Sequence, residues 1–302
     1  MEIERLNTTE NIQPATLDQV SNQTSKPSPV LDLQDLYCIL QIQPNDSFMA
    51  LELGMRLNQL GRTDEALRIF KSVIKIDSRF ETLSALGLLE YRMDLIDDAF
   101  HHLQQAILVS ADGQPEELFE VFKTLGNIFV RRADFELAED NYNKAHRIHS
   151  SSDVLAVNFG TLAIQKQSWE AALEHFRRAI ELNKKNDKAW VGLAIGHRMK
   201  GDFELAWGNL ETALTYNPLN EVALNLALEW GSQEGREFRV LEFLRTFLVE
   251  GGWDEKLSMA FAWLSHRRGE SMVARFELER VLAVNPANTR AHALAAEIRT
   301  QV

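Results

Sequence analysis

The chain has 302 residues, of which 45% are hydrophobic and 25% are charged, proportions typical of a folded globular protein. No apolar run approaches the roughly 18 residues of a membrane-spanning helix, and the start MEIERLNTTENIQ has neither the apolar core nor the basic leader of a secretory signal. A single cysteine, Cys38, excludes an internal disulfide and a cysteine-based zinc site, and its apolar neighbours predict that it packs. We therefore expect a cytoplasmic protein. A net charge of -12 argues against nucleic acid as a partner.

The first 46 residues divide into two parts. Residues 1–30 contain three prolines, no aromatic residue and many Asn, Gln, Ser and Thr residues, which predicts a disordered tail. Residues 31–46, beginning LDLQDLYCILQIQ, predict a helix that caps the N-terminal end of the remaining chain.

Residues 47–288 contain an internal repeat with a usual period of 34 residues. Small residues that come after a turn and open a second apolar stripe recur at Ala66, Ala99, Ala138, Ala172, Ala206, Val240 and Ala274. Twelve residues before each lie Gly54, Gly87, Gly126, Gly160, Ala194, Leu228 and Ala262. Seven residues after each lie Val73, Ala106, Ala145, Ala179, Ala213, Phe247 and Val281. The three series predict seven units of two amphipathic helices each, in which small residues let the helices approach closely.

Segments such as ALELGMRLNQLGRTDEALRIFKSVIKID (50–77) and AWVGLAIGHRMKGDFELAWGNLETALTYNP (189–218) resemble the tetratricopeptide repeat family. The resemblance covers about residues 31–300 and implies an all-α fold: a right-handed α-solenoid of about seven helix-turn-helix repeats, with an N-terminal half-repeat and a C-terminal capping helix at 289–302. Gly61, Gly201, Gly235 and Gly269 fall between paired helices, where a left-handed residue ends the first one. Residues 111–118 lie across an insertion. The sixth unit, with Leu228 in a small-residue slot, departs furthest from the pattern.

The sequence contains no motif for catalysis. A Gly-rich phosphate loop, G-x-S-x-G and H-E-x-x-H are all absent, so we expect neither an enzyme nor a cofactor. His146 and His149 could share one helical face and hold a metal with a third ligand, but a solvated helix end explains them more simply, and no metal site is expected.

Function is therefore expected from a surface. In the family that the chain resembles, the first helices of the units line a concave groove that binds peptides or partner helices. Projecting that rule onto this sequence gives an apolar set: Leu51, Met55, Leu88, Val157, Ile195 and Trp263. It also gives a basic and polar set: Lys123, Asn127, Arg131, Asn158, Lys188 and Arg198. The apolar set would anchor a peptide, unless the curvature of the array buries these residues against one another.

Part of the basic set is similar to the carboxylate clamp of some members of the family. Lys123, Asn127, Asn158 and Lys188 match its pattern, but Gly192 stands where the last Arg would be. The matching donors could hold a C-terminal carboxylate, and the wider basic set could attract an acidic partner.

The sequence thus predicts a non-enzymatic adaptor or scaffold that binds a partner peptide or helix in the groove. Four alternatives remain open: a secretion-type chaperone for a client protein, a regulatory subunit of an enzyme, a component of a motility or polarity complex, and self-association. The N-terminal tail could also occupy the groove.

Overall fold

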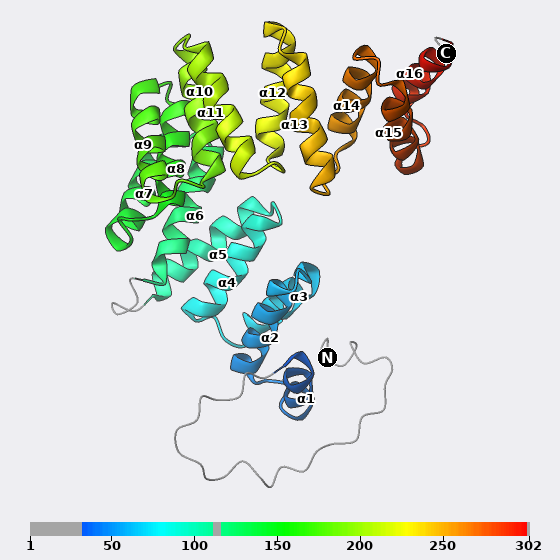
Figure 1. Cartoon of the computed structure of the whole chain (residues 1–302). Helices are drawn as coiled ribbons and strands as arrows, with labels where there is room; N and C mark the ends of the chain where they lie inside the picture. The colour runs from blue at the N-terminus through cyan, green and yellow to red at the C-terminus, as the bar shows by residue number, and fades with distance from the viewer. Residues whose placement is uncertain (1–31, 111–115, 301–302) are drawn as a thin grey trace, which may run out of the picture. The chain divides into compact units, whose positions relative to one another are not determined.

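The computed structural model describes residues 32–110 and 116–300, and these form sixteen α-helices with no strand among them (Figure 1). The predicted tail at 1–30 and residues 111–115 of the predicted insertion lie outside the described residues. The chain divides into two compact units, Met1–Ile128 and Phe129–Val302.

In the first unit, consecutive helices are joined by short turns and packed side by side (Figure 1). They are α1 (Leu33–Ile42), α2 (Ser47–Gln59), α3 (Thr63–Val73), α4 (Phe80–Arg92), α5 (Ile96–Val109) and most of α6 (Leu118–Arg131). Leu36 and Leu40 of α1 are buried against α2 and its neighbours.

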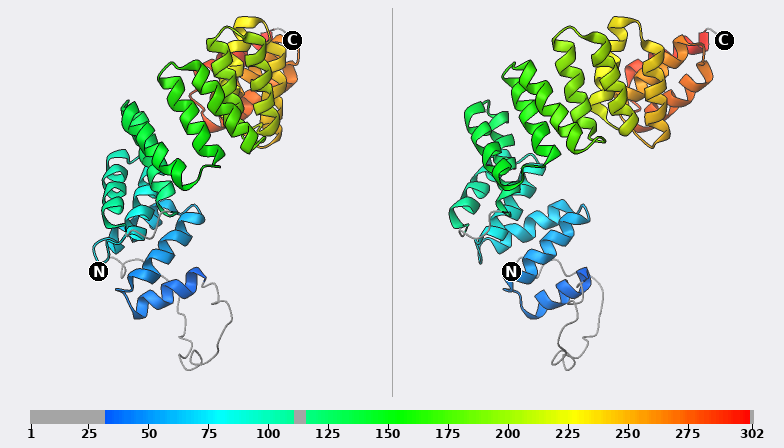
Figure 2. Two further views of the ribbon diagram at one scale, coloured as in Figure 1. Left: turned by 90° about the vertical axis from the view of Figure 1, so that its left-hand side faces the viewer. Right: turned by 60° about the vertical axis from the view of Figure 1, so that its left-hand side comes forward.

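The second unit continues the alternation of helices and short turns (Figure 2). Its helices are α7 (Phe135–Ile148), α8 (Asp153–Gln165), α9 (Trp169–Leu182), α10 (Asp187–Met199), α11 (Phe203–Tyr216), α12 (Glu221–Glu234), α13 (Glu237–Val249), α14 (Glu255–Arg267), α15 (Ser271–Val284) and α16 (Thr289–Thr300). The expected all-α fold of helix pairs is confirmed.

Small residues occupy the closest approaches between helices, as the repeat pattern predicts. The series from Ala66 to Ala274 is no more than 1% exposed throughout. A Cβ added to Gly54 would lie 2.4 Å from the ring of Phe70, and one added to Gly160 would lie 2.6 Å from the ring of Phe176. The glycines therefore make room for aromatic side chains of the next helix.

The turn inside each pair is closed by one residue in the left-handed conformation. Gly61, Gly201, Gly235 and Gly269 have φ between +69° and +85°, as expected from their positions. The equivalent turns in the other three pairs place non-glycine residues there, with φ of 56–63°: Asp94, Ala133 and Gln167. The backbone of the turn is thus the same whether or not the sequence supplies glycine.

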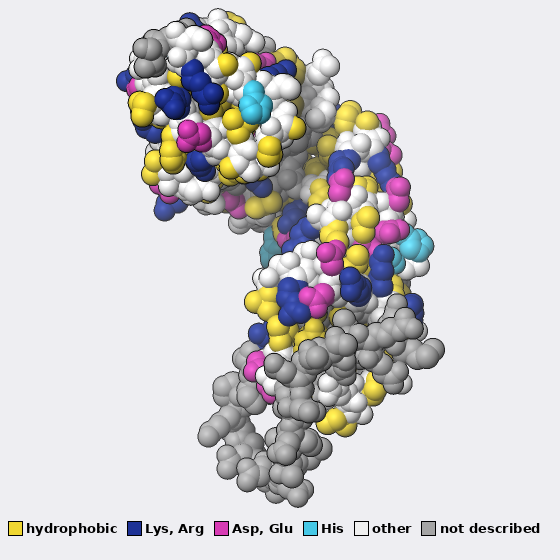
Figure 3. Space-filling view, turned by 90° about the vertical axis from the view of Figure 1, so that its right-hand side faces the viewer, with side chains coloured by type: hydrophobic (Ala, Val, Ile, Leu, Met, Phe, Trp, Pro, Cys, Tyr) yellow, Lys and Arg dark blue, Asp and Glu magenta, His cyan; other side chains and the backbone are white. Residues whose placement is uncertain are grey.

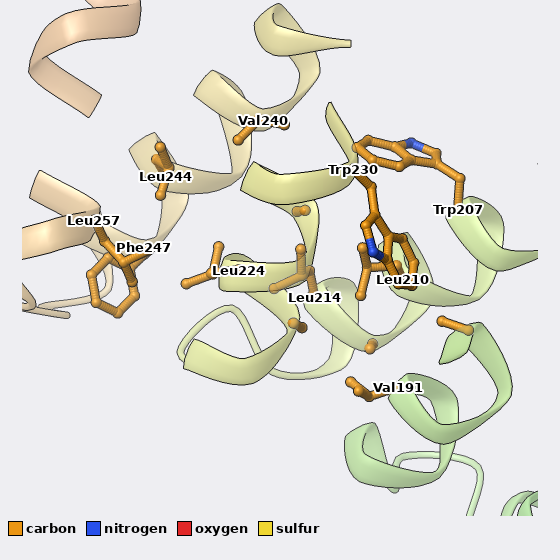
Figure 4. Close-up of a cluster of buried hydrophobic side chains, with 14 of the residues drawn as sticks. Val191, Trp207, Leu210, Leu214, Leu224, Trp230, Val240, Leu244, Phe247 and Leu257 are labelled. Carbon is orange, nitrogen blue, oxygen red and sulfur yellow. The ribbon is translucent and has the colours of Figure 1, made fainter. Parts of the chain in front are cut away.

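The largest buried cluster lies in the second unit between α10 and α14. Figure 4 shows how Trp207 of α11, Trp230 of α12 and Leu244 of α13 fill the space between these helices. Leu210, Leu224 and Leu257 in the same cluster are fully buried. This core holds the sixth helix pair, α12 and α13, between its neighbours.

The prediction that Cys38 packs is wrong, because its side chain is exposed. Leu36 and Leu40, four residues apart, form the buried face of α1. Cys38 lies midway between them in the sequence and therefore on the opposite side of the helix.

Candidate peptide-binding groove

A groove of about 970 Å³ crosses the C-terminal end of the second unit. Its floor comes from α14 and α16, with Met259, Ala260 and Trp263 on one side and Ala293 and Leu294 on the other. The Trp263 side chain is 44% exposed although it is among the largest apolar groups of the chain. An exposed tryptophan in a concave surface is a common anchor point for a protein partner.

A second groove of about 710 Å³ lies beside it, between α12 and α14. It is lined by Val222, Leu226 and Leu228 of α12, and it shares Lys256 and Ala260 of α14 with the first. Val222 is 61% exposed. The two grooves together form one surface over α12, α14 and α16, which we call the C-terminal groove.

Trp263 is held in place from one side. The guanidinium of Arg267 lies 4.8 Å from the centre of a Trp263 ring, and its Nη1 is 2.7 Å from a carboxylate oxygen of Glu237. This ion pair fixes the arginine over the indole, which limits the orientations that the indole can take.

The rim of the C-terminal groove is mainly acidic. Five carboxylates line it, against two basic side chains: Glu221, Glu229, Asp254, Glu255, Glu297, Lys256 and Arg290. Lys256 is directed to a neutral acceptor, because its Nζ donates to Oδ1 of Asn225 at 2.5 Å.

Asparagine side chains tie successive helix pairs of the second unit together. Asn183 and Asn186 both donate to Oδ2 of Asp153, at 2.7 and 2.9 Å. Burial by itself would raise the pKa of Asp153, but the two asparagine hydrogen bonds, together with hydrogen bonds from backbone amides at the start of α8, lower the pKa below its ordinary value. Asn217 and Asn220 bind Asp187 in the same way, both at 2.7 Å.

The next carboxylate in this series, Glu221, is not bound in this way. The residues 30 and 33 positions after it are Gly251 and Asp254, and neither side chain has an amide donor. The pattern resumes one pair later, where Asn285 and Asn288 both donate to Glu255. Glu221 therefore lines the groove without a hydrogen-bond donor to its carboxylate among the described residues.

The sixth helix pair also packs differently. Leu228 occupies the slot that other pairs give to glycine or alanine, and it is half-buried and lines the groove. The close approach of α12 and α13 is found one turn later, at Gly231, where an added Cβ would lie 2.4 Å from Cγ2 of Val240. The departure of the sixth unit from the repeat is thus visible in the structure as a larger side chain in the groove.

The predicted basic and polar residues are divided between the two units. Lys123 and Asn127 belong to the first, and Arg131, Asn158, Lys188 and Arg198 to the second. Lys123 Nζ lies 2.5 Å from Oε1 of Glu120 and 5.3 Å from the ring centre of Phe119. Arg198 is ion-paired with Glu234 and stacks 4.5 Å from a Trp230 ring centre.

Lys188 is exposed at the start of α10. Gly192, one turn later, is buried, and an added Cβ would lie 2.3 Å from the Phe176 ring. A side chain at position 192, where the clamp arginine would be, would therefore point toward α9, and no long side chain fits there without moving Phe176.

The predicted apolar residues fall into two groups. Leu51 and Val157 are at most 9% exposed and belong to buried clusters, so they contribute mainly to packing. Leu88 and Ile195 are half-buried, whereas Met55 and Trp263 are exposed. Of the six, only Trp263 lies in the C-terminal groove.

Glu221, Val222, Glu229 and Asp254 line the groove but were not predicted from the sequence. A signal for Glu221 and Asp254 exists in the chain: the connections NKKN (183–186), NPLN (217–220) and NPAN (285–288) keep both asparagines, whereas GGWD (251–254) has neither.

Other candidate sites are weak. Among the described residues, no group of three His, Cys, Asp or Glu side chains could hold a metal ion. A cavity of about 40 Å³ between α1, α2 and α3 is far smaller than the C-terminal groove. No helix in the described ranges has both the length and the apolar character to cross a membrane. In the space-filling view of Figure 3, Lys and Arg side chains on the C-terminal end of the second unit are scattered among hydrophobic ones.

Curated proteins with similar sequences are distant relatives. The chain is 22% identical over 193 residues to the TPR repeat-containing protein C19B12.01 of Schizosaccharomyces pombe, covering 58% of this chain and 24% of that protein. It is 24% identical over 179 residues to BBSome complex member BBS4 of Bos taurus, covering 59% and 34%. The chain therefore spans about a quarter to a third of the length of these relatives. No protein-family model matches it.

Solved structures share the fold over more of the chain. A tetratricopeptide repeat protein from Parabacteroides merdae aligns with a TM-score of 0.54 and 15% identity, covering 84% of this chain and 98% of that one. YrrB, described as a TPR protein with an unusual peptide-binding site, aligns with a TM-score of 0.50 and 16% identity, covering 65% and 98%. A chain of the APC/C hetero-tetramer Cut9–Hcn1 aligns with a TM-score of 0.53 and 16% identity, covering 88% and 46%.

The paired helices, the small residues at their crossings and the left-handed turns define a helical-repeat protein. With these similarities, the chain has the fold and the repeat pattern of tetratricopeptide repeat proteins.

Proposed function

We propose that the chain is a non-enzymatic protein-interaction module that binds an extended or helical segment of a partner in the C-terminal groove. The observation that carries this proposal is the exposure of Trp263 and Val222 in a concave surface that crosses three helices. A partner would remove this apolar area from water. YrrB, a protein of the same fold, is described as having a peptide-binding site, and BBS4 is named as a member of a complex.

The groove is suited to binding because its main anchor is already ordered. Arg267 and Glu237 hold one face of Trp263, so less side-chain entropy is lost when a partner covers the other surface. Tryptophans in such positions often account for about 2 kcal/mol or more of binding free energy, about a thirtyfold change in affinity.

A random 12-residue peptide library displayed on phage tests the proposal without a known partner. The chain is immobilised, peptides are selected, and the affinities of synthetic copies are measured by fluorescence polarisation. We expect Trp263→Ala to weaken binding about thirtyfold while the thermal unfolding midpoint stays within a few degrees. Met272→Ala on α15 is the matched control, because Met272 is 76% exposed and lies outside the groove.

Failure to select any peptide, or equal binding by wild type and Trp263→Ala, would refute a site in this groove. The basic set remains a separate proposal, in which its residues attract an acidic segment or a C-terminal carboxylate. Selected peptides whose binding is abolished by Lys123→Glu with Lys188→Glu, and not by Trp263→Ala, would support that site instead.

A further inference from the structure

We infer that the segment bound in the C-terminal groove is cationic, with an arginine or lysine placed beside an apolar side chain. This inference rests on the proposed function and adds the charge of the partner to it. It runs opposite to the acidic partner that the basic set suggests.

Glu221 provides the first reason. Asp153, Asp187 and Glu255 occupy the equivalent position in three other helix pairs, and each receives two asparagine hydrogen bonds. Glu221 has the same place at the start of its helix but receives none, and it lines an open groove instead. A cationic donor from a partner would supply the interaction that the chain itself supplies elsewhere.

Asp254 provides the second reason. Asn186, Asn220 and Asn288 cap their helices through Oδ1 and donate to the preceding carboxylate through Nδ2. Asp254 keeps the capping bond, with Oδ1 2.8 Å from the Leu257 nitrogen, but it has no donor to offer. Asp254 therefore offers no amide donor and adds a negative charge to the groove lining.

Glu229 suggests a spacing for the cations. Glu221 and Glu229 lie on α12 and line the same groove, and the two have no ion pair with any described side chain. Eight residues of α-helix separate them, about 12 Å. An extended segment covers that distance in three to four residues, and a helical segment aligned with α12 covers it in about eight. Apolar side chains between the cations would contact Val222, Leu226 and Leu228.

The peptides selected from the random library provide the test. We expect enrichment in Arg and Lys beside Leu, Phe or Trp, and an affinity that falls as salt is raised from about 50 to about 500 mM, because exposed charge pairs are screened. Glu221→Gln with Glu229→Gln should weaken binding about fivefold for each pair lost. Glu174→Gln with Glu279→Gln removes two exposed charges outside the groove and should change affinity by less than about twofold.

Asp254→Asn gives a result that a loss of stability cannot imitate. The new side chain keeps an oxygen for the helix cap and removes one negative charge from the groove, so the cationic peptides should bind more weakly while the unfolding midpoint stays within a few degrees. Peptides that depend on Trp263 but are acidic or uncharged, or that bind the Glu221→Gln/Glu229→Gln variant as tightly as wild type, would overturn the inference and leave the proposed function standing. Loss of the Trp263 dependence itself would remove the proposed function instead.

Discussion

Two glycine-to-alanine substitutions in the middle of helices should change stability in opposite directions. Gly192 of α10 is buried, and an added Cβ would lie 2.3–2.5 Å from three atoms of the Phe176 ring. Gly208 of α11 is exposed, and an added Cβ would have nothing within 4 Å. Alanine in an unobstructed helix is more stable than glycine by about 0.5–1 kcal/mol, so Gly208→Ala should stabilise the chain by that amount.

At Gly192 the same propensity gain is opposed by overpacking, which costs about 1–3 kcal/mol in a filled core. The net expectation for Gly192→Ala is a loss of about 0.5–2 kcal/mol. Phe176 cannot easily move aside, because it is 2% exposed and Gly160 meets the same ring, where an added Cβ would lie 2.6 Å away.

Urea unfolding followed by far-UV circular dichroism gives the two midpoints. Phe176→Leu supplies the mechanistic control: with the ring gone, Gly192→Ala should no longer destabilise, which gives a coupling free energy of about 1–3 kcal/mol. A midpoint that rises equally for Gly192→Ala and Gly208→Ala would show that the Phe176 ring does not fill the space beside Gly192.

Three further predictions concern turns, hydrogen bonds and pH. Ala133→Gly should stabilise the chain by about 0.5–1 kcal/mol, because removing the Cβ strain of a left-handed residue, about 1–2 kcal/mol, outweighs the conformational entropy that glycine adds to the unfolded chain. Gly201→Ala should destabilise the chain for the same reason. An unfolding midpoint equal to that of wild type in either variant would contradict the positive φ of that turn. Asp187→Ala should cost about 1–2 kcal/mol in urea unfolding because two asparagine hydrogen bonds are lost, whereas Glu221→Ala should cost less than about 0.5 kcal/mol; equal losses would refute the difference between the two sites. Burial lowers the pKa of His175 below 6.5, and Glu174 and Glu139 only partly oppose this. As the pH falls, His175 is protonated in the unfolded chain before it is protonated in the folded chain. The contribution of neutral His175 to stability is therefore complete above about pH 6.5 and is lost as the pH falls through the lower folded pKa. His175→Phe should reduce the difference in urea midpoint between about pH 7 and about pH 5, and an unchanged difference would contradict the shift.

Much of the fold could be predicted because the sequence records it in short-range patterns. The series from Ala66 to Ala274 marks helix crossings that are fully buried, and Gly61, Gly201, Gly235 and Gly269 mark turns with positive φ. Ala133 and Gln167 take the same conformation without any sequence signal, because packing of the paired helices imposes it on side chains that do not favour it, whereas Asp94 is of a type that accepts it more readily.

The site was harder to predict because the helical period shows which residues share a face of a helix, but not whether neighbouring helices bury that face. Leu51 and Val157 lie at groove positions by sequence, yet neighbouring helices bury them, while Trp263 at a similar position stays exposed near the end of the array. Basic residues were also selected by type. Glu120, the partner of Lys123, lies one turn earlier on the same helix, whereas Glu234, the partner of Arg198, comes close only when α10 and α12 are placed side by side.

The sixth helix pair is where local rules and the observed structure diverge, and these divergences meet on one surface. Leu228 replaces a small residue, the helix crossing lies at Gly231, and Asp254 stands where other pairs have an asparagine that binds the preceding carboxylate. In a repeat array each pair is stabilised mainly by its neighbours, so a weakened contact between two pairs costs only a local part of the folding free energy. The large cluster that contains Trp207, Trp230 and Leu244 packs the sixth pair against its neighbours. The sixth pair thus departs from the repeat on the surface that faces the groove, while its core remains packed. This arrangement is expected of a binding site, because sequences depart from local structural rules mainly at functional sites.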